Sequence, residues 1–341
     1  MSDSSSINQH TAILLINTGS PAALTPSEVR KYLIRFLTDS RIIGLAPPLR
    51  HLLVRGLIAP LRAKSSIKKY QRIWSDEGPL LRVYSHRLSQ KMEALSGITV
   101  RCAMRYERDS VRTALAELHA LGKTEVILLP LFPHYAISSF ETAVIHVRDI
   151  AQRAGLFSMS LRCVKPYYGH PEYVEAFARS LSAHVRAGDH VVFSFHGIPL
   201  YQVDPYVDQP LYDYPWQCTE MTRLALAHPL LSSIGGVTHE ICYQSRFGHH
   251  KWLSPATIDR VKSLPSEGYK RIVVVCPSFV CDCLESVDEI GYEAEEDFRH
   301  AGGDVLDFVP CLNDDDATAQ ALLSIAKTCT LPLSELLPPG L

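Results

Sequence analysis

The sequence has no long uninterrupted apolar segment. Its first ten residues are polar and rich in serine, without the apolar stretch that an export signal requires. No later segment approaches the roughly 20 consecutive apolar residues of a membrane-spanning helix. These two absences argue against a secreted protein and against an integral membrane protein, so we expect a cytoplasmic one.

The chain also lacks a dominant charge of one sign and a cysteine framework. Its 34 basic and 36 acidic residues give a formal net charge of -2, which does not favour nucleic acid as a partner. Its nine cysteines, without an export signal, are more typical of free thiols than of disulfides. Cys276, Cys281 and Cys283 follow neither a zinc nor a ferredoxin spacing, and only Cys329 comes after Cys311. We therefore expect no iron–sulfur cluster and no other tightly bound cofactor.

What the chain does contain is a regular alternation of short apolar segments with longer helical patterns. With 341 residues, 46% of them hydrophobic, it has material for two domains of ordinary size. The alternation is typical of parallel sheets with helices on both faces. The strand candidates fall into two groups of four: 12–17, 99–104, 125–131 and 159–164, then 190–195, 239–243, 271–276 and 305–308.

The two groups resemble each other in sequence. "ILLINTGSP" aligns without gaps with "VVFSFHGIP", which pairs Thr18 with His196. "LFPHYAISSFET" aligns in the same way with "VCPSFVCDCLES", which pairs Glu141 with Glu285. We therefore predict an α/β fold of two similar Rossmann-like halves, each with a doubly wound, four-stranded parallel sheet, facing each other across a cleft. We place the halves at residues 8–157 and 158–330, followed by a tail at 331–341.

His196 is the first candidate for chemistry, because an apolar strand ends on it. Ligands of open parallel sheets bind beyond the carboxyl ends of the strands, where loops converge. Gly197 frees the backbone and Pro199 restricts it, so the pair can present the imidazole rigidly at this edge. The alternative is a structural histidine, which would need a partner because a buried unsatisfied polar group costs about 1–3 kcal/mol.

A row of acidic residues is the second candidate. Asp282 and Glu285 follow a predicted strand, and Glu289 and Glu293 continue from Glu285 at intervals of four, so they share one side of a helix. The row is either a solvated acidic face or a path for cations or protons. A histidine opposite such carboxylates suits a divalent metal or paired proton transfer.

Other candidate residues follow other strand ends. These are Arg105 and Tyr106 in "MRYERD", and Gln244, Ser245 and Trp252 in "YQSRFGHHKWLSP". The apolar segment 41–62, with regularly placed arginines and several prolines, has no counterpart of similar length in the second half. It either packs on the first half or forms an apolar rim for a substrate or for peripheral contact with the inner face of a membrane.

The ordered motifs "LLINTGSP", "MRY", "FSFHGIP", "YQSRFG" with "WLSP", "CPSFVCDCLESVDEI" and "FVPCLND" resemble the ferrochelatase family over about residues 12–323. This family inserts ferrous iron into a porphyrin to make haem, and its fold consists of two Rossmann-like halves. The resemblance implies Fe²⁺ and protoporphyrin IX as substrates. Coproporphyrin III, another metal, or a protein that only binds porphyrin or haem remain as alternatives.

The resemblance also implies roles for individual residues. His196 matches the active-site histidine and Glu285 the carboxylate that faces it, and both are expected to contact the metal. Asp282, Glu289 and Glu293 match the acidic row behind them, and the porphyrin would meet Thr18, Arg105, Tyr106, Gln244, Ser245 and Trp252. Thr18 stands at a variable position where it favours protoporphyrin IX. The segment 200–215 departs from the family pattern, and Cys283 stands where several relatives carry histidine.

Overall fold

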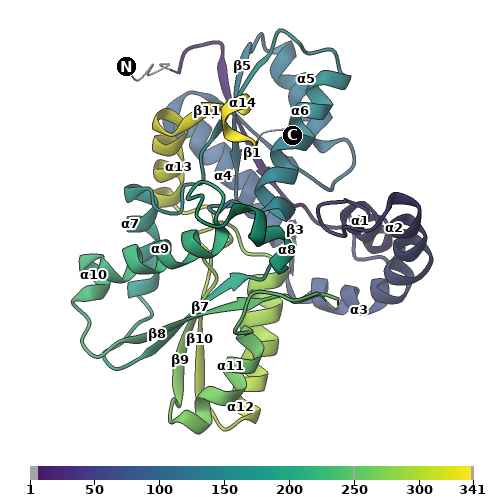
Figure 1. Ribbon diagram of the computed structural model, residues 1–341. Helices are drawn as coiled ribbons and strands as arrows, with labels where there is room; N and C mark the ends of the chain where they lie inside the picture. The colour runs from purple at the N-terminus through teal and green to yellow at the C-terminus, as the bar shows by residue number, and fades with distance from the viewer. Residues whose placement is uncertain (1–6, 249, 339–341) are drawn as a thin grey trace. The chain divides into compact units, whose positions relative to one another are not determined.

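The computed structural model describes residues 7–248 and 250–338. The chain divides into two compact units. Unit 1 takes in the chain up to Leu131, Ile137–Lys165 and the chain from Leu323, and unit 2 takes in Phe132–Ala136 and Pro166–Leu322. Each unit is built on its own sheet (Figure 1).

The sheet of unit 1 has the strand order β11-β6-β5-β1-β4. Four strands are parallel and lie where the sequence predicted them, and the short β11 pairs antiparallel with β6 at the edge. The strands are β1 (Thr11–Asn17), β4 (Thr99–Met104), β5 (Glu125–Pro130), β6 (Ser160–Val164) and β11 (Thr330–Pro332).

The sheet of unit 2 has the strand order β10-β9-β7-β8, and all its pairs are parallel. The strands are β7 (His190–His196), β8 (Thr238–Gln244), β9 (Arg271–Val275) and β10 (Val305–Val309). The order of β6, β5, β1 and β4 in unit 1 is therefore repeated by β10, β9, β7 and β8. This agreement confirms two similar doubly wound halves.

Helices cover both faces of each sheet. Parallel crossovers are right-handed, so the reversal of strand order after β4 places α4 on one face and α5 and α6 on the other. The helices of unit 1 are α1 (Pro26–Leu37), α2 (Pro47–Leu53), the π-helix η1 (Val54–Ile58), α3 (Ala59–Arg72), α4 (Leu80–Ser96), α5 (Ser110–Ala120), the π-helix η2 (Ile137–Glu141), α6 (Thr142–Arg153) and α14 (Leu333–Leu336). A small hairpin of β2 (Trp74–Ser75) and β3 (Gly78–Pro79) precedes α4, and α13 (Asp316–Thr328) contributes to both units.

In unit 2 the same rule places α9 on one face and α11 and α12 on the other. The helices are α7 (Pro171–Ser182), α8 (Leu200–Val203), the 3₁₀-helix η3 (Asp204–Tyr206), α9 (Tyr214–Ala227), α10 (Pro229–Ser232), α11 (Thr257–Ser263), the 3₁₀-helix η4 (Leu264–Glu267), the π-helix η5 (Leu284–Ala294) and α12 (Glu295–His300). One core cluster joins Val192 and Val274 of the sheet to Val261, Ile290 and Phe298.

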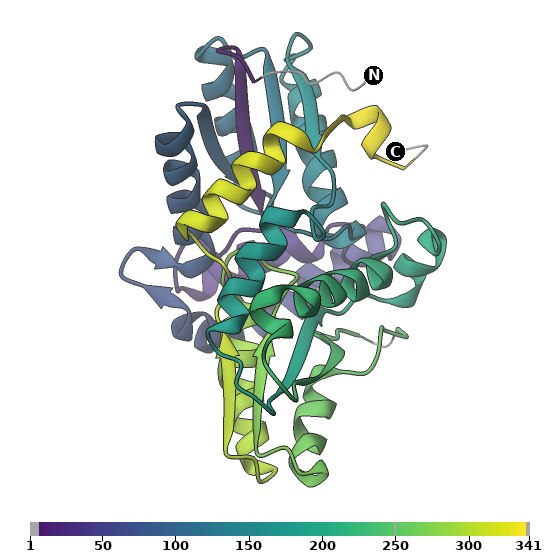
Figure 2. The same ribbon diagram turned by 90° about the vertical axis from the view of Figure 1, so that its left-hand side faces the viewer.

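The structure divides the chain differently from the predicted boundary at 157/158 and from the predicted tail at 331–341. β6 hydrogen-bonds with β5, so residues up to Lys165 belong to unit 1. The last described residues belong to unit 1 as well, because β11 adds to the edge of its sheet (Figure 2, yellow). A strand of three residues has too little periodicity to be recognised in the sequence.

The segment 41–62 is helical from Pro47 onward. It forms α2, η1 and the beginning of α3, and its inner side packs through Val54 and Ala59 against Leu37 at the end of α1. Within the described residues no helix is both long and apolar enough to span a membrane.

The buried position of Phe298 generates a stability prediction. Phe298 is fully buried against the second sheet, whereas Phe157 is 82% exposed. We expect Phe298→Ala to lower the free energy of unfolding by about 3–5 kcal/mol, because it leaves a cavity. Phe157→Ala is the matched control and should change it by less than about 0.5 kcal/mol. Urea denaturation followed by circular dichroism measures both, and equal effects of the two variants would contradict the packing described above.

Candidate active site in unit 2 and polar network in unit 1

His196 ends the central strand of unit 2 and is held at both its backbone and its ring. Its N–H donates to Ser278 Oγ (3.0 Å), and its carbonyl oxygen accepts from the hydroxyl of Tyr214 (2.8 Å). Its Nδ1 lies 2.7 Å from the carbonyl oxygen of Gly197. A carbonyl oxygen only accepts, so Nδ1 carries the proton of the neutral ring and Nε2 presents the free lone pair.

The charge state of His196 depends on its surroundings. Burial lowers its pKa below the ordinary value of 6.5, and the Glu285 carboxylate and the Gly197 carbonyl oppose that shift without cancelling it. The imidazole is therefore neutral near pH 7. A neutral imidazole with its Nε2 free can accept a proton or donate a lone pair to a metal ion.

Gly197 is required for space. An added Cβ would lie 2.6 Å from the carbonyl oxygen of Gln244, and that oxygen accepts a 2.8 Å hydrogen bond from the Gly197 N–H. The φ angle of Gly197 is not among the positive ones, so the sequence argument from unusual backbone geometry was wrong for this residue. The close approach of the Gly197 and Gln244 backbones is what excludes a side chain at position 197.

Glu285 lies in the first turn of η5, which begins directly after Cys283. The Cys283 N–H donates to Ser286 Oγ (2.9 Å), and its sulfur accepts from the backbone N–H of Ser286. Burial, followed by the nearby Glu285 carboxylate, raises the pKa of the Cys283 thiol, so the thiol stays protonated. The first turn of η5 is therefore held by reciprocal capping.

The acidic row lies on one side of η5. Glu285, Glu289 and Glu293 are half-buried, while Ile290 and Ala294 are buried against the sheet. The sequence predicted the row on an ordinary helix, and the structure places it on a π-helix, a form that often occurs at functional sites. His196 ends β7 and Glu285 follows β9. These are the neighbouring strands at which the strand order reverses, and this is where ligands of such sheets bind.

Gln244 is a buried link within the site. Its Oε1 accepts from Ser194 Oγ (2.7 Å), and its Nε2 donates to the backbone carbonyl of Glu285 (2.5 Å). It is paired in register with His196. Its amide is thus engaged with protein groups and joins the end of β7 to the beginning of η5.

Ser245 and Asp282 are also engaged with neighbouring protein groups. The N–H and Oγ of Ser245 donate to the two carboxylate oxygens of Glu289, at 2.7 Å and 2.5 Å. Asp282 accepts from Asn313 Nδ2 (2.7 Å), Ser286 Oγ (2.9 Å) and a backbone N–H. Asp282 is buried and joins the start of η5 to the loop after β10.

Trp252 stands beside His196 in the same unit. Adding a Cβ to Gly197 would bring it within 3.5 Å of the Trp252 ring, and Trp252 forms an isolated bridge with Pro199. The indole Nε1 is buried without a hydrogen-bond partner among the described residues. That N–H remains available as a donor.

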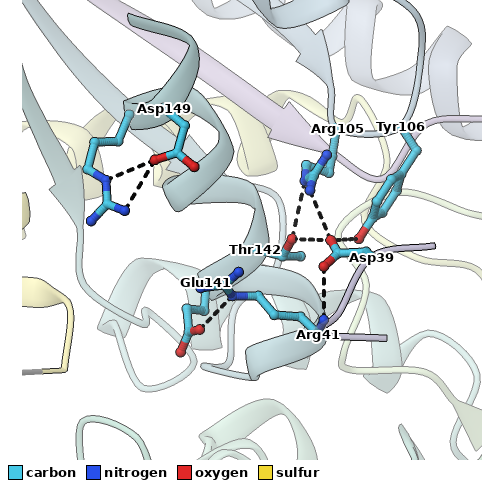
Figure 3. A network of polar contacts seen from close by, with 8 residues as sticks. Asp39, Arg41, Arg105, Tyr106, Glu141, Thr142 and Asp149 are labelled. Carbon is cyan, nitrogen blue, oxygen red and sulfur yellow. Dashed lines mark hydrogen bonds and ion pairs between the residues drawn. The ribbon is translucent and has the colours of Figure 1, made fainter. Parts of the chain in front are cut away.

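Arg105 and Tyr106 belong to a separate polar network in unit 1 that the sequence did not reveal (Figure 3). Its centre is Asp39, whose Oδ2 accepts from Arg105 Nη2 (2.9 Å), the Tyr106 hydroxyl (2.9 Å) and Thr142 Oγ1 (2.6 Å). Tyr106 is 3% exposed and its hydroxyl is used within the protein. One signal was available, because Asp39 is the only carboxylate between Glu28 and Asp76.

Thr18 lies beside this network. Its carbonyl oxygen accepts from the Tyr106 N–H (3.0 Å), and its own N–H donates to Asn17 Oδ1 (2.8 Å). It is half-buried directly after β1, at the position that aligns with His196 at the end of β7.

No three histidine, cysteine, aspartate or glutamate side chains are grouped so as to hold a metal ion, within residues 7–248 and 250–338. All nine cysteines are free thiols, as expected.

Comparison with known proteins identifies the family of this chain. The ferrochelatase family profile matches residues 10–329. The chain belongs to the ferrochelatase family. A ferrochelatase from Pseudomonas fluorescens is 37% identical over 94% of this chain and 99% of that relative. One from Vibrio atlanticus is 38% identical over 91% of this chain and 95% of that relative.

A solved structure supports the family's fold in this chain. SirB from Bacillus subtilis with Fe³⁺ superimposes with a TM-score of 0.53 at 14% identity, covering 93% of this chain and 94% of SirB. At this identity the likeness concerns the fold alone, and it agrees with two Rossmann-like halves.

The electrostatics of His196 generate a pH prediction. Because the Glu285 carboxylate raises the pKa of His196 against the effect of burial, we expect Glu285→Gln to lower that pKa further. NMR titration of the imidazole resonances measures it. Glu289→Gln is the control and should leave the pKa of His196 unchanged. A His196 pKa that stays the same or rises in Glu285→Gln would contradict the predicted interaction.

Proposed function

We propose that the protein is a ferrochelatase, which inserts Fe²⁺ into protoporphyrin IX, releases two protons and forms protohaem in the last step of haem biosynthesis. The observation that carries the proposal is the placement of His196. Its neutral imidazole lies at the point where the strand order reverses, its Nδ1 is held by the Gly197 carbonyl, and the Glu285 carboxylate raises its pKa against the effect of burial. Family membership supports the same reaction.

His196 is assigned the proton chemistry. The two pyrrole N–H protons must leave as the metal enters the ring. An imidazole that is neutral near pH 7 accepts one of them, and the carboxylates of the acidic row are proposed to carry the other to solvent. Once charged, the imidazolium is stabilised by the Glu285 carboxylate, which favours the protonated form. The Nδ1 hydrogen bond keeps Nε2 directed away from the Gly197 carbonyl throughout.

Iron delivery is assigned to the same pair together with the acidic row. Imidazole and carboxylate groups can replace water around Fe²⁺ stepwise, so His196 and Glu285 are proposed to contact the metal. Glu289 and Glu293 extend the row of carboxylates along η5. Asp282 and Ser245 support this path by holding the start of η5 and by fixing Glu289.

Porphyrin binding is assigned to residues with donors left over. These are Arg105 and the Trp252 indole, and Thr18 is assigned with them from its place after β1. Tyr106 and Gln244 support the site through their hydrogen bonds to protein groups. Thr18 favours protoporphyrin IX over coproporphyrin III as the substrate. Any further porphyrin contact of Gln244 or Ser245 requires these hydrogen bonds to open.

An anaerobic insertion assay tests the activity. Purified protein is mixed with Fe²⁺ and protoporphyrin IX or coproporphyrin III, and the porphyrin spectrum is followed. We expect repeated turnover with protoporphyrin IX in preference. Stoichiometric binding without turnover would favour a porphyrin-binding protein and would refute the enzyme, whereas faster turnover with coproporphyrin III would refute the substrate assignment.

His196→Ala tests the assigned base. Loss of a general base lowers rates by about 10²- to 10⁴-fold, so we expect kcat to fall by this factor while porphyrin binding persists. His239→Ala is the matched control, because His239 is exposed near the opposite end of the sheet, at the start of β8. Turnover of His196→Ala close to that of the control would exclude His196 as the base.

We further propose that segment 41–62 contacts the surface of an anionic membrane from the cytoplasmic side. Five leucines are exposed there, among them Leu52 at 72% and Leu61 at 69%. The chain has no acidic residue between Asp39 and Asp76, while Arg55, Arg62 and Lys64 are exposed. Exposed leucines beside basic side chains suit the interface of an anionic bilayer.

Vesicle cosedimentation tests this contact. We expect the wild-type protein to bind vesicles rich in phosphatidylglycerol and the double variant Leu52→Ser/Leu61→Ser to bind at least about tenfold more weakly, because each leucine loses its apolar transfer energy. Leu95→Ser/Leu121→Ser is the control, since both leucines are about half exposed elsewhere in unit 1. Equal binding of the two double variants would refute the membrane contact.

A further inference from the structure

Asp39 is the centre of the polar network of unit 1. It follows α1, and its side chain is 5% exposed. Three donors converge on one carboxylate oxygen, and the other oxygen accepts the Arg41 N–H at 2.9 Å. Burial opposes the charge, but the hydrogen bonds and the Arg105 guanidinium outweigh it and lower the pKa of Asp39 below 3.8. Asp39 is therefore a buried, fully hydrogen-bonded carboxylate.

The network joins the loops at the carboxyl edge of the first sheet. The backbone N–H groups of Arg105 and Tyr106 donate to the carbonyl oxygens of Asn17 and Thr18. The side chain of Arg35, on α1, donates to the carbonyl oxygen of Tyr106 at 2.7 Å. The chain after β1, the chain after β4 and the end of α1 therefore meet at one point.

This network fixes the Arg105 guanidinium and leaves one of its amino groups without a hydrogen-bond partner among the described residues. Its Nη2 donates to Asp39 and its Nε donates to Thr142 Oγ1 (3.2 Å), while the Thr142 hydroxyl itself donates to Asp39. The guanidinium also lies 4.6 Å from the centre of the Tyr106 ring. Within the described residues Nη1 has no partner, and the side chain is 19% exposed. The planar guanidinium can therefore direct Nη1 in one orientation only.

The neighbouring ionisable groups do not compete for Asp39. His146, one turn beyond Thr142 on α6, has its pKa lowered to about 4 by burial first and then by Arg105, so it is neutral. The Arg41 guanidinium instead forms a second, partly buried ion pair with Glu141, at 2.8 Å (Figure 3). The Arg105 guanidinium is thus held chiefly by Asp39 and Thr142.

We propose that Asp39 is a positioning residue for porphyrin binding: it orients the Arg105 guanidinium so that Nη1 faces the ligand. Nothing in the sequence pattern assigned this role, because Asp39 meets its partners only in the folded unit. The inference rests on the proposed function in so far as the ligand is a porphyrin.

The test is a double-mutant cycle on Asp39 and Arg105. Protoporphyrin IX binding without iron is measured by porphyrin fluorescence, and kcat for iron insertion is measured separately. Asp39→Asn should raise the porphyrin Kd by about tenfold, the effect of one hydrogen bond to a charged group, and should change kcat by less than about threefold. In the Arg105→Gln background, Asp39→Asn should add less than about twofold.

A matched control is Glu141→Gln, which breaks the adjacent, partly buried ion pair with Arg41 and removes none of the Arg105 hydrogen bonds given above, so it should leave the porphyrin Kd unchanged. If Asp39→Asn is not recovered as a folded protein, the variant Thr142→Val is measured in its place. It removes the hydroxyl between Arg105 and Asp39 and should raise the Kd by about threefold.

The outcomes separate the two proposals. A porphyrin Kd unchanged in the folded variant, or raised equally in the presence and absence of Arg105, overturns the positioning role of Asp39. A wild-type protein that binds porphyrin but turns over no iron overturns the proposed function, while the Kd measurements still decide the role of Asp39.

Discussion

Parallel pairing around a central strand is the constraint on which both units depend. β7 lies between β8 and β9, so the ends of all three strands meet at one edge, and the reversal of strand order opens a place beyond β7 and β9 for side chains. His196 ends β7 and is paired in register with Gln244. A slip of this register would separate the imidazole from the amide that holds η5.

Polar groups around His196 are divided between chemistry and support. Gln244 and Ser278 each hydrogen-bond with a backbone group, of Glu285 and of His196, which fixes the first turn of η5 and the end of β7. Buried polar groups of this kind must be satisfied, and satisfied they restrict the site to one arrangement. His196 Nε2 has no hydrogen bond within the described part of the chain, and this difference is why we propose His196 as the reactive member of the set.

The two units use the same frame for different purposes. A π-helix follows the third predicted strand in each, η2 after β5 and η5 after β9. Glu141 and Glu285 occupy the aligned positions, but Glu141 is paired with Arg41, whereas the Glu285 carboxylate raises the pKa of His196. Unit 1 places Asp39, Arg105 and Tyr106 at its sheet edge, where an ion pair and hydrogen bonds hold the Asp39 carboxylate.

The sequence by itself determined the strands, the two similar halves, the position of His196 and the spacing of the acidic row, because these depend on local periodicity and on short motifs. Only the tertiary structure decided that Gly197 is needed for space, that Gln244 and Asp282 are held by protein groups, and that β11 joins the first sheet. It alone revealed Asp39, whose partners Arg105 and Thr142 are 66 and 103 residues away in the chain. Such contacts have no local pattern, because they arise from long-range packing of hydrogen-bonding groups away from water.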